Sequence, residues 1–182
     1  MSSIRWSNGR VHRTTSSEEL PELNTTCAWA KAAWLVRATG GKLVVVQKNA
    51  VLLERPVLLW ERMFATFGAL GPAICPPGWG ESLLRSHFTE GIRAVLSGVS
   101  EHDGPAGLDL VCQWGWDAVS RGGRVAGAPA THRDTWRRCN DRDVRAAVGV
   151  LASFGALRLD GPPDARRVAL TPLGRAALPS CW

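Results

Sequence analysis

The sequence predicts a mainly α-helical protein with small β-hairpins. Three observations lead to this fold class. Apolar residues recur three and four positions apart over several segments, which is the period of an amphipathic helix. Short β-branched stretches bounded by glycine or proline interrupt these segments and are typical of strands. Apolar residues make up 45% of the 182 residues, enough for a packed core in one domain or two small ones.

The chain is expected to begin with a polar arm at residues 1–24, a stretch without a hydrophobic period. A helix should follow, because Thr25 or Thr26 can cap its start and the Gly40-Gly41 pair can end it. The apolar, β-branched residues 43–46 then predict a short strand.

The middle of the chain is predicted to be helical. Pro56 suits the first position of a helix, where its missing N–H is not needed. Residues 81–99 and 108–119 show the helical period, and so does a helix at 141–154 that Asn140 can cap. The apolar side of this last helix consists of Val144, Val148 and Leu151. Tryptophans in helical settings are expected in the core: Trp29, Trp34, Trp60, Trp114 and Trp116.

The end of the chain predicts a hairpin followed by a short helix. Residues 156–159 and 168–170 are the expected strands, and Gly161-Pro162-Pro163-Asp164 is a turn between them. Thr171 can cap the last helix, with Pro172 at its first position. The predicted order is therefore helix, strand, basic loop, strand and short helix.

This order resembles the winged-helix domain of regulators of the multiple-antibiotic-resistance type. In those proteins the recognition helix ends in a phrase such as L…GAL, and the wing closes with V-x-L-T-x-x-G-R. The matching phrases here are LASFGAL (residues 151–157) and VALTPLGR (residues 168–175). The resemblance covers residues 141–178 and implies a DNA-binding wing.

A second copy of this unit is expected in the first half. KLVVVQKNAVLL (residues 42–53) aligns without a gap on RVALTPLGRAAL (residues 167–178). Asn49 falls on Gly174, and Asn and Gly are the residues that most easily take the left-handed conformation. The alternative is that two short apolar strands look alike by chance.

These observations give the expected domain organisation. A polar N-terminal arm spans 1–24, a partial winged-helix-like unit 25–56, connecting helices 57–105 and a C-terminal winged-helix-like domain 106–182. The segment LPELNTTCAWAKAAWLVRATGGKLVVVQKNAVLLERPVLLWERMF (residues 20–64) is also similar to actinobacterial passenger proteins of mobile elements. That group offers no catalytic residue to carry over. Its members have more chain upstream, so an N-terminally shortened member is expected.

The overall charge favours an anionic partner. The net charge is +6 and the isoelectric point is about 9.6. The alternative is an arginine-rich composition without functional meaning, because arginine far outnumbers lysine.

The motifs of enzymes are missing from the sequence. It contains no phosphate-binding loop, no dinucleotide-binding glycine pattern and no hydrolase nucleophile elbow. We therefore expect no catalytic residues, no cofactor and no metal site. The five cysteines form no C-x-x-C pair, which favours a reducing cytoplasm, and no apolar run is long enough for a membrane span.

The candidate nucleic-acid face lies on the predicted helix around 141–154. Arg138, Arg142 and Arg145 are four and three residues apart, opposite the apolar side. Gly149 continues this side. A glycine inside a helix costs about 1 kcal/mol relative to alanine, so it indicates close approach of a DNA backbone or of another helix.

The base of the predicted hairpin completes this face. Arg166 and Arg167 can reach a phosphate or the minor groove of double-stranded DNA. The segment 133–175 holds nine arginines and five aspartates, a net charge of 9 − 5 = +4. One feature opposes this hypothesis, because no clear helix stands a short turn before Asn140, as a helix-turn-helix requires.

The sequence thus predicts a DNA-binding protein, a transcription regulator or an accessory protein of a mobile element. One alternative is a winged-helix module that binds a protein partner or forms a homo-oligomer, and another is a truncated, inactive remnant. An exposed, continuous set of arginines favours DNA. Pairing of these arginines with Asp141, Asp143 or other acids favours a protein partner.

Overall fold

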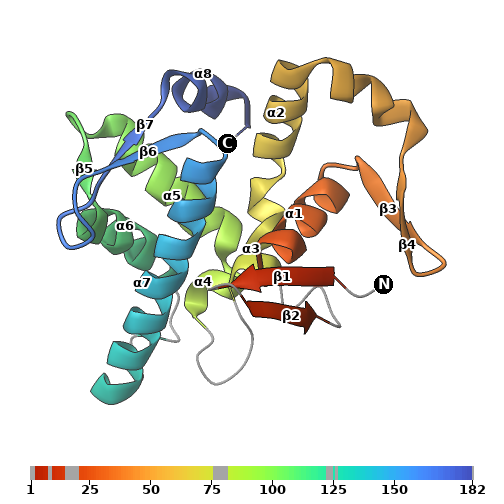
Figure 1. Ribbon diagram of the computed structural model, residues 1–182. Helices are drawn as coiled ribbons and strands as arrows, with labels where there is room; N and C mark the ends of the chain where they lie inside the picture. The colour runs from red at the N-terminus through yellow and green to blue at the C-terminus, as the bar shows by residue number, and fades with distance from the viewer. Residues whose placement is uncertain are drawn as a thin grey trace.

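The computed structural model describes residues 3–7, 10–14, 21–75, 82–121, 125 and 127–181. The fold is mainly helical with small antiparallel sheets, as predicted (Figure 1). The helices are α1 (Pro21–Ala32), α2 (Pro56–Ala65), α3 (Gly71–Ile74), α4 (Leu83–Ser86), α5 (Phe88–Glu101), α6 (Leu108–Ser120), α7 (Ala130–Ser153) and α8 (Pro172–Cys181). The described residues also include the 3-10 helices η2 (Gln47–Glu54) and η3 (Phe67–Leu70).

The strands of the described residues form three separate sheets. β1 (Ser3–Ser7) pairs with β2 (Arg10–Thr14), and β3 (Val36–Thr39) pairs with β4 (Lys42–Val45). The third sheet has the order β5–β7–β6, built from β5 (Ala106–Gly107), β7 (Arg167–Leu170) and β6 (Leu157–Asp160). All pairs are antiparallel.

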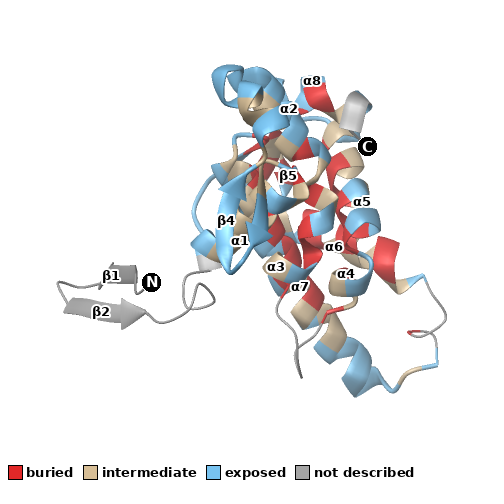
Figure 2. Ribbon diagram, turned by 90° about the vertical axis from the view of Figure 1, so that its right-hand side faces the viewer, coloured by how far each residue is buried: buried red, intermediate tan, exposed pale blue. Residues whose placement is uncertain are grey.

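The C-terminal half packs α5, α6 and α7 against this three-stranded sheet. Figure 2 shows the buried residues concentrated on the inner sides of these helices. Gly115 lets α6 approach α7, because a Cβ there would lie 2.8 Å from the side chain of Val144. The core of this half includes Ile92, Val111 and Leu151, each without exposed surface.

Aromatic side chains join the two halves of the chain. The rings of Trp29 and Phe154 lie 4.2 Å apart, and the ring of Trp60 stacks on Phe154 at 5.3 Å. The indole of Trp60 donates a 2.8 Å hydrogen bond to the carbonyl oxygen of Phe154, and that of Trp29 donates one of 2.6 Å to Met63. The last turn of α7 is therefore fixed to α1 and α2.

Several predicted elements are confirmed with small shifts. The strand expected at 43–46 is β4, the helix expected from Pro56 is α2, and the helix expected at 108–119 is α6. The hairpin at the end of the chain is β6 and β7. Thr171 caps α8, since its hydroxyl accepts a 3.0 Å hydrogen bond from the Gly174 N–H.

The first forty residues differ from the prediction. Residues 3–7 and 10–14 pair as strands, and α1 begins at Pro21, so the span 1–24 is not a structureless arm. The helix ends at Ala32, well before Gly40. Gly40 and Gly41 both have positive φ and form the two-residue turn of the β3–β4 hairpin, a turn type that favours glycine. Trp34 has a φ of +58° and is exposed, so it is not a core residue.

The helix expected at 141–154 begins earlier, at Ala130. Its first turns carry polar side chains on most sides, which leaves no hydrophobic period to reveal them. Asn140 consequently lies inside α7, fully buried, and is not a cap. The helix before it is α6, which packs on α7 and is joined to it by residues 121–129.

Two further expectations are wrong. The helix expected at 81–99 is divided at His87 into α4 and α5, and Glu81 lies outside the described residues. The alignment of Asn49 with Gly174 does not reflect a left-handed backbone, because neither residue has a positive φ. Gly174 is needed for another reason: a Cβ there would overlap the carbonyl oxygen of Ala156.

Candidate nucleic-acid interface

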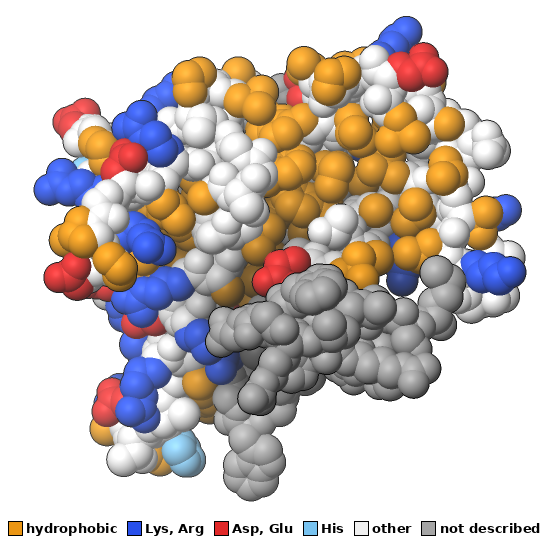
Figure 3. Space-filling view, viewed as in Figure 1, with side chains coloured by type: hydrophobic (Ala, Val, Ile, Leu, Met, Phe, Trp, Pro, Cys, Tyr) orange, Lys and Arg blue, Asp and Glu red, His pale blue; other side chains and the backbone are white. Residues whose placement is uncertain are grey.

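A stripe of arginines runs along one side of α7. Arg138, Arg142 and Arg145 are all exposed, and Gly149 follows them one turn further on. The opposite side of the helix is buried in the core through Val144. Figure 3 shows Lys and Arg side chains gathered over α7 and the neighbouring β6–β7 side of the molecule. The helical period therefore separates a basic side from a core side.

Arg145, Arg166 and Arg167 line one hollow. It has a volume of about 480 Å³ and lies between α7, the start of α6 and the loop that joins β6 to β7. Asp109 and Asp164 also line it. The structure thus brings three of the predicted site residues together, although Arg145 is more than twenty residues from the other two in sequence. A hollow lined by three arginines and two aspartates has a basic excess and suits a phosphate.

Arg145 forms an ion pair that the sequence did not reveal. Its Nη2 lies 2.6 Å from Oδ1 of Asp109, and the side chain of Asp109 is 90% exposed. Exposed ion pairs contribute only about 0–1 kcal/mol, so a phosphate can replace the carboxylate at small cost. The pairing neutralises Arg145 in the free protein without removing it from the surface.

Arg142 has a different role, because its partner is buried. Its Nε lies 2.7 Å from Oδ1 of Asp143, whose side chain is 1% exposed. Ser82 donates a 2.6 Å hydrogen bond to the other carboxylate oxygen. The hydrogen bond to Asp143 raises the pKa of Arg142 above its ordinary value. Arg142 is therefore held against α7 and compensates a buried negative charge.

Arg138 lies at the outer part of the stripe. Its side chain is exposed and donates a long 3.4 Å hydrogen bond to the hydroxyl of Thr135. The neighbouring Arg137 is bound more tightly: it contacts Asp141 at 2.9 Å and Gln113 at 2.8 Å, and lies over the ring of Trp116. Of these two adjacent arginines, Arg138 is the one available to a phosphate.

Gly149 is surrounded by open space. A Cβ built on it would meet no atom of the described residues within 4 Å, so close packing against the described part of the chain does not explain the glycine. We expect Gly149→Ala to stabilise the fold by about 0.5–1 kcal/mol, because alanine favours a helix interior. We also expect it to weaken DNA binding severalfold, because a methyl group would hold a phosphate away from the helix.

Thermal unfolding and DNA titration of this one variant test both parts. A gain in stability together with weaker binding supports direct approach of DNA at Gly149. A gain in stability with unchanged binding would show that DNA does not approach α7 at this turn.

A cluster of buried polar side chains lies under the arginine stripe and was not predicted from the sequence. Ser82, Asn140 and Asp143 are all buried, and neither side-chain polar atom of Asn140 has a hydrogen-bond partner. Asn140 and Asp143 each lie four residues before an apolar core position of α7, Val144 and Ala147, and polar residues at such positions were the available signal. Ser82 could not be connected with them, because it is far away in sequence.

Burial disfavours the reactive thiolate form of Cys75 and Cys112. Burial, reinforced by the charge of Asp143, raises the pKa of Cys75 to about 12, and burial raises the pKa of Cys112 to about 11. Both thiols are therefore protonated near neutral pH. In the described part of the chain, no group of three or more His, Cys, Asp or Glu side chains is placed to hold a metal ion.

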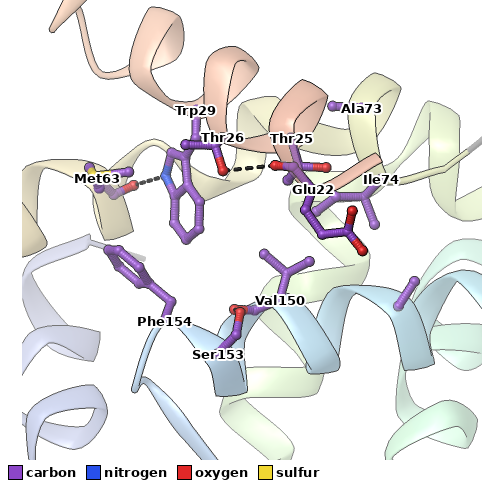
Figure 4. A pocket seen from close by; sticks show the side chains of 11 residues that line it. Glu22, Thr25, Thr26, Trp29, Met63, Ala73, Ile74, Val150, Ser153 and Phe154 are labelled. Carbon is purple, nitrogen blue, oxygen red and sulfur yellow. Dashed lines mark hydrogen bonds between the residues drawn. The ribbon is translucent and has the colours of Figure 1, made fainter. Parts of the chain in front are cut away.

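A second hollow, of about 460 Å³, lies between α1 and the last turns of α7 (Figure 4). Its walls are largely apolar and include Trp29, Val150 and Phe154, and Glu22 is the charged residue among the described residues that line it. Thr26 donates a 2.8 Å hydrogen bond to the carbonyl oxygen of Glu22. Its described lining offers space for an apolar group and includes no pair of groups for acid–base chemistry.

The fold and these sites define a mainly helical protein with a basic helix beside a small sheet. No family model, no curated protein and no solved structure matches the chain. Across the described residues, no helix has both the length and the apolar character needed to cross a membrane. Trp79 and Trp182, which are expected from the sequence to be exposed or to serve an interface, lie outside the described residues.

Proposed function

We propose that the protein binds double-stranded DNA through α7 and the β6–β7 hairpin. The observation that carries this proposal is the pair of exposed arginines Arg138 and Arg145 on one side of α7, which continues into the hollow shared with Arg166 and Arg167. Phosphate contacts from arginines supply most of the affinity of such interfaces. In a cell, the role would be transcriptional control or an accessory function of a mobile element.

The order of the elements supports a winged-helix-like domain in the C-terminal half. A helix, a short strand, two helices and two strands follow one another as α5, β5, α6, α7, β6 and β7. In the proposed complex α7 lies in or against a major groove, which admits an α-helix. The loop between β6 and β7 then lies on the flanking backbone.

A protein partner is the second candidate function. It is favoured by the ion pairs of Arg142 with Asp143 and of Arg145 with Asp109, since paired arginines are less available to phosphates. DNA remains the better proposal because Asp109 is exposed and its pair is weak, and because Arg138 and Arg167 are exposed.

The test is fluorescence anisotropy of a labelled random-sequence duplex, titrated at several salt concentrations. The variant carries Arg138→Ala, Arg145→Ala and Arg167→Ala, and leaves Arg142 in place because it compensates Asp143. We expect the slope of log K against log salt to fall by about three, which corresponds to three lost phosphate contacts.

The matched control carries Arg37→Ala, Arg55→Ala and Arg93→Ala, three exposed arginines on other elements that remove the same charge. A smaller loss in the control supports the proposed interface. If both variants lose the same DNA affinity, the binding depends on net charge and not on the proposed interface. No binding by folded wild-type protein at low salt would reject DNA and favour a protein partner.

A further inference from the structure

Two segments of the chain have the same local architecture. α1 with β3 and β4, and α7 with β6 and β7, each form a helix, a tight turn and an antiparallel hairpin. In each turn one residue has a positive φ, +58° at Trp34 and +79° at Gly155.

The backbone hydrogen bonds of the two segments correspond one for one. In the first segment the N–H donors and their carbonyl acceptors are Ala33 to Trp29, Trp34 to Lys31, Leu35 to Ala30 and Val46 to Leu35. In the second segment they are Phe154 to Val150, Gly155 to Ala152, Ala156 to Leu151 and Thr171 to Ala156. This correspondence places β4 on β7, with Leu43 on Val168 and Val45 on Leu170.

The two hairpins differ at one edge. The outer edge of β7 is covered by β5, which places Ala106 opposite Val168 and Gly107 opposite Arg167. The sheet of β4 contains only β3, so in the described part of the chain no strand covers its outer edge. By the correspondence, the backbone groups of Leu43 and Val45 face outward, as those of Val168 and Leu170 do toward β5.

The side chains on this edge are apolar and exposed. Leu43, Val44 and Val45 are 49%, 43% and 45% exposed, whereas Val168 and Leu170 are 0% and 8% exposed. The hairpin stands out from the helices, where a second molecule can reach it (Figures 1 and 2). An unpaired strand edge with apolar side chains is a template for another strand. The other strand of this hairpin, β3, is less apolar, because it carries Arg37 and Thr39.

We propose that β4 pairs antiparallel with β4 of a second copy of this chain, which forms a four-stranded sheet across a two-fold axis. Pairing centred on Val44 places Leu43 opposite Val45 of the other copy. Within the two β4 strands no charged residue then lies near the axis, and the two Lys42 residues lie at opposite ends of the interface, opposite Val46. In each copy Arg37 of β3 lies across from Val44, on the side of β4 away from the axis. The same strand therefore supplies both sides of the interface, as a two-fold axis requires, and this favours a second copy of the chain as the partner. The inference does not depend on DNA binding.

The test is sedimentation equilibrium, which measures the average molecular mass of the protein at increasing protein concentration. We expect a reversible wild-type dimer with a Kd in the micromolar range, because a short strand pair buries less than the roughly 1,200 Å² of stable complexes. Val44→Asp and Val44→Lys place like charges opposite one another at the axis, so each variant alone should dissociate at least tenfold more readily. An equimolar mixture of the two should recover the dimer, because Asp then faces Lys.

The control is Val57→Lys, which removes an exposed valine on α2 and should leave the dimer unchanged. Circular dichroism melts show whether each variant keeps the fold. A wild-type protein that stays monomeric to about 200 µM, far above the micromolar Kd expected here, overturns the proposal. So does a dimer that both Val44 variants leave intact, or two dissociated variants whose mixture stays monomeric.

Discussion

Replacing Gly174 with alanine is expected to lower the free energy of unfolding by about 3 kcal/mol, at the upper end of the usual cost of overpacking. The new methyl group would overlap the carbonyl oxygen of Ala156 and lie 3.0 Å from its carbonyl carbon. Both are backbone atoms, so no side-chain rotation can relieve the overlap. Helix α8 must move away from the start of β6, which weakens its contacts with β7 and α2.

Thermal unfolding followed by circular dichroism measures this effect. For a chain of this length the midpoint should fall by roughly 6–12 °C. Gly149→Ala is the matched control, because it makes the same chemical change inside a helix with open space around it. A Gly174→Ala midpoint equal to that of the wild type would mean that α8 does not pack as closely as described.

The second large effect is expected from Arg142→Ala. It leaves the carboxylate of Asp143, which is 1% exposed, without the guanidinium that lies 2.7 Å away. Breaking a buried ion pair from one side typically costs 3–5 kcal/mol. The Arg142 side chain is half-exposed, so water screens part of this interaction and we expect a loss of about 2–3 kcal/mol.

Chemical denaturation of four proteins tests this expectation. Arg138→Ala, one turn away on the same side of α7, is the control and should change stability by less than about 0.5 kcal/mol. The double variant Arg142→Ala, Asp143→Asn should be more stable than Arg142→Ala alone, because it removes the uncompensated charge. If Arg142→Ala and Arg138→Ala unfold at the same denaturant concentration, the ion pair with Arg142 is not needed to stabilise the buried carboxylate of Asp143.

Local patterns were sufficient for much of the fold. The proline at the start of α2, the β-branched residues of β4 and the threonine that caps α8 each act on their immediate neighbours. Such signals are read from a few adjacent residues, and the elements they predict are present. The apolar positions Val144, Val148 and Leu151 also identified the core side of α7.

The candidate site was predictable only in part. The spacing of Arg138, Arg142 and Arg145 placed them on one side of a helix, because the helical period is a local property. The hollow shared by Arg145, Arg166 and Arg167 depends on how the hairpin folds back onto α7. The acidic partner of Arg145 could not be predicted either, because Asp109 lies on another helix. The hydrogen bond from Ser82 to Asp143 could not be predicted because the two residues are far apart in sequence.

The sequence by itself determined the mainly helical class, the positions of α2, α6, α8 and the β6–β7 hairpin, the basic charge and the arginine stripe, since each depends on composition or on neighbours within a few residues. Only the tertiary structure decided that α7 begins at Ala130, that Asn140 is buried inside it, that Arg142 compensates a buried carboxylate and that no strand of the described residues covers the second edge of β4. These properties depend on which surfaces meet when distant segments pack, and that choice is made by the whole chain.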